Sequence, residues 1–240
     1  MTERPVYLDY AASTPIDERV WARMREVADL TCANPSSTHA AGEQAQQVIA
    51  AAAQQLADLL NTAPARLVWT SGATESDNLA IAGGARYRAH RGKHLVTMKT
   101  EHKAVTDVFD KLAAEGFEVS WVEAGPDGIL DPAVFAAALR DDTQLASIMF
   151  VNNETGVIQD VVALGALCRD RDILFHVDAA QAVGKVPIDL DALPIDLMSM
   201  TAHKCYGPKG IGALYVADRP GCHVEPLLYG GGQQGRIRPG

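Results

Sequence analysis

The sequence contains no pair of cysteines at the spacing that zinc ribbons and redox dithiols use. Its four cysteines, Cys32, Cys168, Cys205 and Cys222, lie far apart. In a reducing cytoplasm such residues mostly serve as small apolar side chains, and the pattern predicts no metal site. Cys205 stands beside Lys204, but adjacent residues of an extended segment point in opposite directions. This argues against Cys205 as a nucleophile.

Clusters of basic residues and long apolar runs are also missing. The formal net charge of −9 at pH 7 argues against a nucleic-acid surface, although a local site can still bind a small anion. No apolar run approaches the length that crosses a bilayer. Residues 1–9 resemble neither a secretory signal nor a transit peptide. These absences predict a cytoplasmic protein without nucleic-acid or membrane partners.

Short apolar segments that alternate with helical segments dominate the rest of the chain. The expected strands are 67–70, 94–98, 117–122, 145–151, 173–177, 195–200 and 212–216. The expected helices are 42–60, 75–91, 104–115, 133–140 and 161–169. Segment 145–151 is almost entirely apolar, which is typical of a strand buried on both faces. The alternation predicts an α/β layer structure with a mostly parallel sheet.

Small and polar residues follow the first expected strand at the point where a helix begins. In parallel sheets, ligands bind beyond the carboxyl ends of the strands. Residues 71–75 combine glycine, alanine and hydroxyl side chains, and the free N–H groups of a helix start attract anions. The hydroxyl of Thr74 adds a donor. The same residues also make ordinary helix caps, and the segment matches neither a nucleotide P-loop nor the dinucleotide pattern.

Further polar residues follow the next expected strands. His102 can be structural, or it can lie flat against an aromatic ligand or exchange protons. Asn152, Asn153 and Glu154 follow segment 145–151. They can be turn formers, or they can orient a substrate carboxylate and a ring oxygen.

Asp178 ends an apolar strand, where a carboxylate pays a desolvation cost unless a cation meets it. A protonated pyridine nitrogen is such a cation, and an aspartate beside it lets the ring accept electrons. A helix N-cap is the alternative interpretation of Asp178. Gln181, three residues further on, can reach a ring hydroxyl.

Lys204 follows another apolar segment and is flanked by Thr201, His203 and a turn rich in glycine and proline. A solvated surface charge explains these surroundings poorly. An amine held to form a Schiff base explains them well, and that chemistry requires an aldehyde cofactor with an anionic group. An acid at the end of one strand, followed by a histidine–lysine pair after the next, favours this interpretation.

These motifs follow one another in the order found in a known family. They are Tyr7–Pro15, Asn34–His39, Thr70–Ala80, Thr100–Val105, Val151–Gly156, His176–Gln181 and His203–Gly212. The chain resembles a pyridoxal-phosphate-dependent cysteine desulfurase of the aminotransferase class V group. It is most similar to desulfurases that supply sulfur for iron–sulfur cluster assembly and tRNA thiolation. The resemblance implies the large domain of fold type I, with a mostly parallel seven-stranded sheet flanked by helices.

The resemblance also implies roles for individual residues. Lys204 would hold pyridoxal 5′-phosphate and later move protons at the substrate α-carbon, and His102 would stack on the ring and assist. Asp178 would pair with the ring nitrogen and Gln181 with the ring oxygen. The phosphate would be held by Thr74, Thr201, His203 and the backbone at Ala73. Asn153 would lie on the side of the substrate carboxylate.

The implied reaction removes sulfur from L-cysteine, leaves a persulfide on an enzyme cysteine and releases L-alanine. In the family, the nucleophilic cysteine and the carboxylate-binding arginine lie beyond the position of residue 240, so the chain is expected to lack them. We expect residues 1–14 to join a small domain whose C-terminal part is missing. Residues 15–240 would form the incomplete large domain.

The family's homodimer is in doubt for this chain, because the segment ending at Gly240 departs from the family pattern at Gln234, Gly235, Arg236 and Pro239. The family partners would be iron–sulfur scaffold and sulfur-carrier proteins. Two alternatives remain open. One is a selenocysteine lyase or another class V enzyme, and the other is a non-catalytic fragment that binds pyridoxal phosphate.

Overall fold

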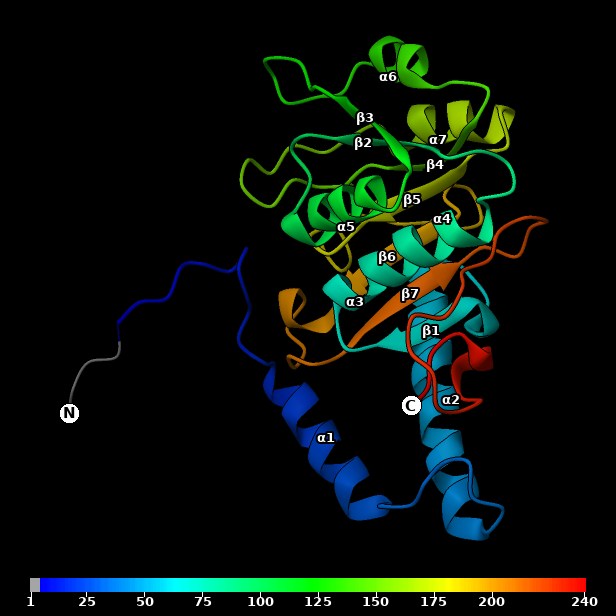
Figure 1. The fold of residues 1–240 in the computed structure, drawn as a ribbon. Helices are drawn as coiled ribbons and strands as arrows, with labels where there is room; N and C mark the ends of the chain where they lie inside the picture. The colour runs from blue at the N-terminus through cyan, green and yellow to red at the C-terminus, as the bar shows by residue number, and fades with distance from the viewer. Residues whose placement is uncertain (1–4) are drawn as a thin grey trace.

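A seven-stranded sheet forms the centre of the molecule in a computed structural model that describes residues 5–240 (Figure 1). The strands are β1 (Leu67–Thr70), β2 (His94–Met98), β3 (Glu118–Val122), β4 (Thr143–Ser147), β5 (Leu174–Asp178), β6 (Leu197–Thr201) and β7 (Gly212–Val216). Their order across the sheet is β1-β7-β6-β5-β4-β2-β3. The expected α/β architecture is confirmed.

Among these strands, only β7 runs against its neighbours. It pairs antiparallel with both β1 and β6, whereas β6, β5, β4, β2 and β3 pair in parallel. The carboxyl ends of the six remaining strands therefore meet at one edge of the sheet. Ligand sites of parallel α/β sheets lie at this edge.

Helices cover both faces of the sheet. The α-helices are α1 (Glu18–Leu30), α2 (Ala40–Leu60), α3 (Ala73–Asn78), α4 (Gly84–Tyr87), α5 (Lys103–Ala114), α6 (Pro132–Ala138) and α7 (Val161–Asp170). A π-helical turn at Leu79–Gly83 joins α3 to α4, so residues 73–87 form one continuous helical rod. Figure 1 shows this rod and α5 crossing in front of the sheet.

Alternate residues of the same strands build two separate cores, because successive side chains of a strand point to opposite faces. One core joins the leucines at positions 95, 145, 174, 197 and 214 to the helical rod and α5. The other joins Val96, Ala146, Phe175 and Met198 to α6, α7 and the end of α2. Each fully buried side chain of this size contributes about 1.5–3 kcal/mol. Both faces of the central strands are therefore apolar, as predicted for segment 145–151.

Two details differ from the sequence-based expectation. The fourth strand ends at Ser147 rather than at residue 151, although the N–H groups of Ile148 and Phe150 still donate to the neighbouring segment. Helix α1 was not predicted. Asp17 caps it by accepting from the Arg19 N–H, and none of its residues is buried. Propensity without a buried face gives little signal in a sequence.

Helix α1 and the outer part of α2 extend away from the sheet (Figure 1). The expected small-domain segment 1–14 precedes α1, and its residues 1–4 lie outside the described part. Between residues 5 and 240, no helix is long and apolar enough to cross a membrane.

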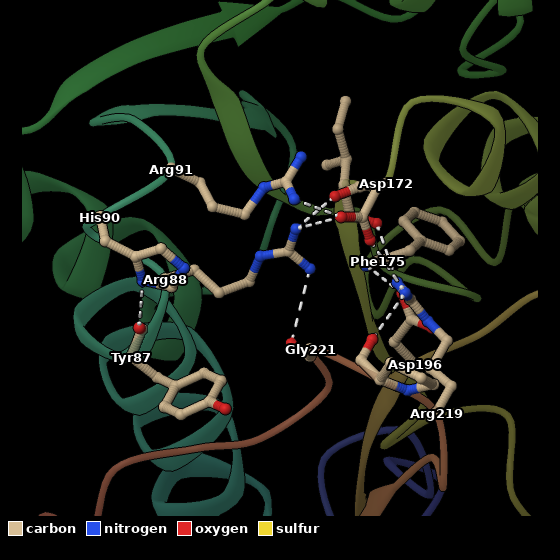
Figure 2. A network of polar contacts seen from close by, with 11 residues as sticks. Tyr87, Arg88, His90, Arg91, Asp172, Phe175, Asp196, Arg219 and Gly221 are labelled. Atoms are coloured by element: carbon tan, nitrogen blue, oxygen red, sulfur yellow. Dashed lines mark hydrogen bonds and ion pairs between the residues drawn. The ribbon is translucent and has the colours of Figure 1, made fainter.

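The edge of the sheet opposite the carboxyl ends carries a network of ion pairs (Figure 2). Asp172 contacts Arg88, Arg91 and Arg219 at 3.1, 2.6 and 3.1 Å. Arg219 also binds both carboxylate oxygens of Asp196, whose Oδ2 in addition accepts the Phe175 N–H at 2.9 Å. Each of these five charged side chains thus has at least one partner of opposite charge, although Arg88 Nε is buried without a hydrogen-bond partner among the described residues.

Candidate functional site

A cavity of about 730 Å³ opens at the carboxyl ends of the parallel strands. It brings together all nine residues that the sequence singled out, from five separate segments of the chain. They are Ala73, Thr74, His102, Asn153, Asp178, Gln181, Thr201, His203 and Lys204. The structure thus places these residues around one space.

The turn between β1 and α3 forms one wall of the cavity. Gly72 has φ of 152°, and a Cβ added there would lie 3.7 Å from Thr201 Oγ1. Inside the turn, Thr70 Oγ1 lies 2.7 Å from Ser76 Oγ. The first N–H groups of the helical rod have no acceptor within the helix. Together with the Thr74 and Thr201 hydroxyls, they can bind an anion.

Glu75 closes this wall from outside. Its carboxylate accepts the Ser71 N–H at 2.7 Å and pairs with Arg238 at 2.8 Å. Partial burial favours the neutral acid, but the hydrogen bonds from Arg238 and Ser71 outweigh it and lower the pKa of Glu75. The turn is therefore held in part by Arg238, which lies near the C-terminal end of the described residues.

Lys204 lies in a single 3₁₀ turn, Ala202–Lys204, directly after β6. It is partly buried, and within residues 5–240 its amine makes no hydrogen bond or ion pair. The backbone carbonyl of the preceding His203 accepts from the Thr14 N–H at 2.8 Å. Lys204 therefore presents a free amine to the cavity from an anchored turn.

His203 is held by the N-terminal segment. Its Nδ1 lies 3.2 Å from Ser13 Oγ. Burial, followed by the positive charges of Lys204 and Lys209, lowers the pKa of His203. A neutral imidazole remains, which can donate one N–H into the cavity.

Asp178, the last residue of β5, lies at the floor of the cavity and is 5% exposed. Its Oδ1 accepts the Ala180 N–H at 2.9 Å, so the capping role considered from the sequence is present. Burial raises the pKa of Asp178, against the effects of that hydrogen bond and of Lys204 and His102. A cation inside the cavity would stabilise the ionised carboxylate.

His102 stands at the cavity mouth as the N-cap of α5. Its Nδ1 accepts the Ala104 N–H at 3.1 Å, which leaves Nε2 as the nitrogen that carries a proton in the neutral ring. The cap fixes the ring beside the cavity. One nitrogen is thus free to exchange a proton or to contact a ligand.

Gln181 is more restrained than the sequence suggested. Its Nε2 donates to the Ala11 carbonyl at 2.6 Å, and its Oε1 accepts from Lys185 at 2.8 Å. The N-terminal segment thereby reaches the cavity, and Asp9, Ala11 and Ala12 line it. Both the nitrogen and the oxygen of the Gln181 amide therefore already make hydrogen bonds, and a ligand would have to share one of these atoms.

Asn153 and its neighbour Asn152 have different surroundings. Asn152 is buried, donates to the Thr100 carbonyl at 3.0 Å and accepts from the backbone N–H groups of Glu154 and Thr155. It therefore shapes the turn. Asn153 lines the cavity and donates only to the Glu154 carboxylate at 2.9 Å.

Sequence reasoning missed several residues at or behind the cavity wall. Lys209 and Asp77 line the cavity, and Glu101 is a buried acid beside His102. Asp77 and Glu101 occur in motifs quoted above, but a helix interior and a strand-end position gave no sign that they would be buried. A buried acid is recognised only once the packing is known.

None of the four cysteines lines the cavity. Cys205 donates to the backbone carbonyls of Thr201 and Ala202 at 3.6 and 3.3 Å. Burial raises its pKa, which disfavours the reactive thiolate. Burial likewise raises the pKa of Cys222 to about 12. The expectation that Cys205 is no nucleophile agrees with this placement.

The family model of aminotransferase class V matches residues 6–238. A protein named cysteine desulfurase IscS from Pseudomonas fluorescens is 54% identical over 98% of this chain. A protein of the same name from Methylococcus capsulatus is 53% identical. The chain spans 59% of the length of these curated relatives.

Solved structures show the same similarity. A structure titled "SspA in complex with cysteine" is 41% identical, with a TM-score of 0.93. It aligns with 98% of this chain, which covers 67% of that protein. A structure titled "NifS-like protein" is 36% identical, with a TM-score of 0.94, and 64% of it is covered.

Proposed function

The chain belongs to the aminotransferase class V family, and on that basis we propose that it forms the pyridoxal 5′-phosphate-binding domain of a cysteine desulfurase. The substrate would be L-cysteine and the products L-alanine and an enzyme persulfide. Relatives named cysteine desulfurase and a structural neighbour solved with cysteine support this proposal. The observation that carries it is the free Lys204 amine, which shares one cavity with the Asp178 carboxylate and an anion-binding turn.

The groups in the cavity fit this cofactor. A phosphate needs N–H and hydroxyl donors, which the start of the helical rod, Thr74, Thr201 and His203 provide. A pyridine nitrogen that carries a proton needs an anion, which Asp178 provides. An aldehyde needs an amine, which Lys204 provides. When bound, the cofactor supplies a ring that accepts electrons from a carbanion.

Lys204 would bind the cofactor aldehyde and would then act as the base at the substrate α-carbon. The turn that carries Lys204 keeps the amine within the cavity. This turn is anchored because the backbone carbonyls of His203 and Tyr206 accept from the N–H groups of Thr14 and Asp17. His102, fixed by its cap bond to Ala104, would cover the ring and hold a proton at Nε2. Gln181 and Asn153 would orient the ring oxygen and the substrate carboxylate.

The cavity contains no cysteine to accept sulfur, so a second candidate concerns this chain in isolation. With Cys205 and Cys222 protonated and engaged elsewhere, the described residues would bind the cofactor without completing sulfur transfer. An alanine assay on the purified chain with L-cysteine distinguishes the two cases. Sustained alanine release, abolished by Cys205→Ser, would overturn the second candidate.

The remaining features extend this proposal. Residues 15–240 would form the cofactor-binding domain, and residues 1–14 would join a second domain. Partners would be iron–sulfur scaffold and sulfur-carrier proteins, and the protein would act in the cytoplasm. Copurification with such a scaffold protein tests the partner proposal.

The decisive experiment uses Lys204→Ala. The chain reconstituted with pyridoxal 5′-phosphate should show the visible absorbance band of a Schiff base, and Lys204→Ala should lose that band because the covalent attachment is gone. Borohydride trapping followed by peptide mass mapping should place the label on Lys204. Lys99→Ala serves as control, since Lys99 is exposed and paired with Glu123. A label that survives Lys204→Ala would refute the assignment.

A further inference from the structure

Asp77 is a buried acid that the proposed reaction does not use. It lies on the inner side of α3 and is 1% exposed, yet it lines the cavity. Neither of its carboxyl oxygens has a hydrogen-bond partner within the described residues. A carboxylate in such a position would recover little of its lost hydration. The burial and the missing partners together call for a neutral form or a ligand.

The side chains beneath Asp77 do not supply a positive charge. His176 Nε2 lies 3.6 Å from Asp77 Oδ1, but it bonds Ser199 Oγ at 2.9 Å. Its other nitrogen lies 2.8 Å from Ser147 Oγ. Burial lowers the pKa of His176 to about 3. The imidazole is therefore neutral and cannot act as a counter-ion for Asp77.

The nearest charges around Asp77 are those of other acids. Burial, followed by the charge of Asp178, raises the pKa of Asp77 well above its usual range, and Glu101 raises it further, while the nearby Ser199 hydroxyl and the charge of Lys204 lower it. Burial also raises the pKa of Asp178, but the hydrogen bond from the Ala180 N–H and the charges of Lys204 and His102 lower it. Two neighbouring buried carboxyls cannot both ionise at low cost. One of them must hold a proton.

We propose that Asp77 is the proton-holding partner of Asp178 and a positioning residue of the cavity. Asp77 stays a neutral carboxylic acid, so the floor carries one negative charge, located on Asp178. This inference rests on the proposed function, in which Asp178 faces a singly protonated ring nitrogen. One carboxylate matches one such cation, whereas a second buried charge would remain uncompensated.

The proton on Asp77 can be observed without any ligand. Infrared spectra of the ligand-free chain at neutral pH should contain carbonyl absorption of protonated carboxylic acids, at higher frequency than amide or carboxylate bands. Asp77→Asn should remove part of this absorption, and Glu101→Gln should remove another part. Asp107→Asn, which changes an exposed acid on α5, should remove none. Asp77→Ser provides a second variant if Asp77→Asn does not fold.

Binding then tests what the proton does for the site. We expect Asp77→Asn to keep the affinity for pyridoxal 5′-phosphate within about threefold of wild type. Asp178→Asn should weaken binding about tenfold or more, because it removes a charge-assisted contact. With a carbocyclic analogue, in which CH replaces the ring nitrogen, the loss caused by Asp178→Asn should disappear.

Two results would overturn the role of Asp77. One is an infrared spectrum that Asp77→Asn and Asp77→Ser leave unchanged. The other is a loss of affinity in Asp77→Asn that equals the loss in Asp178→Asn and vanishes with the analogue, since Asp77 would then be an ionised contact of the nitrogen. Failure of the wild-type chain to bind pyridoxal 5′-phosphate would instead refute the proposed function. The infrared result does not depend on whether the chain binds pyridoxal 5′-phosphate, because it is measured on the ligand-free chain.

Discussion

Both edges of the sheet carry ionisable side chains, but they use them in opposite ways. At the edge shown in Figure 2, three arginines and two aspartates form one connected network of ion pairs. At the cavity edge, Asp77, Glu101 and Asp178 are buried with few partners, and Lys204 is unpaired within the described chain. Paired charges stabilise the fold. Unpaired charges cost stability and are available to a ligand.

The energetic reason is that a buried charge loses its favourable hydration free energy, which contacts with a partner of opposite charge must replace. For Arg219, the contacts with Asp196 and Asp172 replace this free energy, and they raise the pKa of Arg219. For Asp178, the hydrogen bond from the Ala180 N–H replaces only part of the lost hydration free energy. The structure therefore predicts that substitutions at the two edges differ in what they damage, either stability or ligand binding.

The largest expected effect is at the paired edge. Asp196→Ala should lower the free energy of unfolding by about 3–5 kcal/mol, because the partly buried Arg219 keeps only its contact with Asp172 and the Phe175 N–H loses its acceptor. Urea denaturation of the ligand-free chain measures it. In variants that stay folded, the affinity for pyridoxal 5′-phosphate should be unchanged.

The matched control is Asp142→Ala. Asp142 pairs with Arg140 through two hydrogen bonds, but both side chains are more than 40% exposed. Its removal should cost less than about 1 kcal/mol. Equal losses in the two variants would show that burial does not distinguish these ion pairs.

A smaller effect of the opposite kind is expected at the cavity. Asp178→Asn should weaken binding of pyridoxal 5′-phosphate by about 1.5–3 kcal/mol, the range for a hydrogen bond to a charged group. The stability of the ligand-free chain should not fall, because a poorly compensated carboxylate is removed. Fluorescence titration and urea denaturation give the two values. A large loss of stability with normal binding would contradict the comparison.

The smallest effect is a difference in pH dependence. Burial raises the pKa of Glu101 well above its usual range. Glu101 therefore stays protonated to a higher pH in the folded chain than in the unfolded chain. Stability is then lost as the pH rises from the unfolded pKa towards the folded one, by up to about 1.4 kcal/mol per pH unit. Glu101→Gln should remove this loss, which urea denaturation at a series of pH values would reveal.

Asp172 should respond in the opposite direction. Although burial opposes it, Arg219 and Arg88 lower the pKa of Asp172, so its contribution is present above the unfolded pKa and is lost as the pH falls through the folded one. Asp172→Asn should therefore remove a loss of stability on acidification. If Glu101→Gln and Asp172→Asn change the pH profile in the same direction, the two edges do not differ as described.

Much of this arrangement was predictable from local sequence. Strands β1, β2 and β7 were predicted at their observed bounds, because short apolar runs bounded by turns leave few alternatives. The helix expected at 133–140 is also present, as α6 at Pro132–Ala138. Helix α1 was not, because it buries nothing, and the end of β4 was misplaced because the apolar run continues past the strand.

The same division applies to the cavity. The nine site residues were singled out from their position after apolar strands and from the resemblance to a known family, and parallel strands must bring their carboxyl ends together. The sequence alone therefore determined which residues gather at that edge. Only the tertiary structure decided that Gln181 is pinned by Ala11 and Lys185, and that Asp77 is buried without a partner. Burial and pairing depend on contacts between distant segments, and local spacing does not encode them.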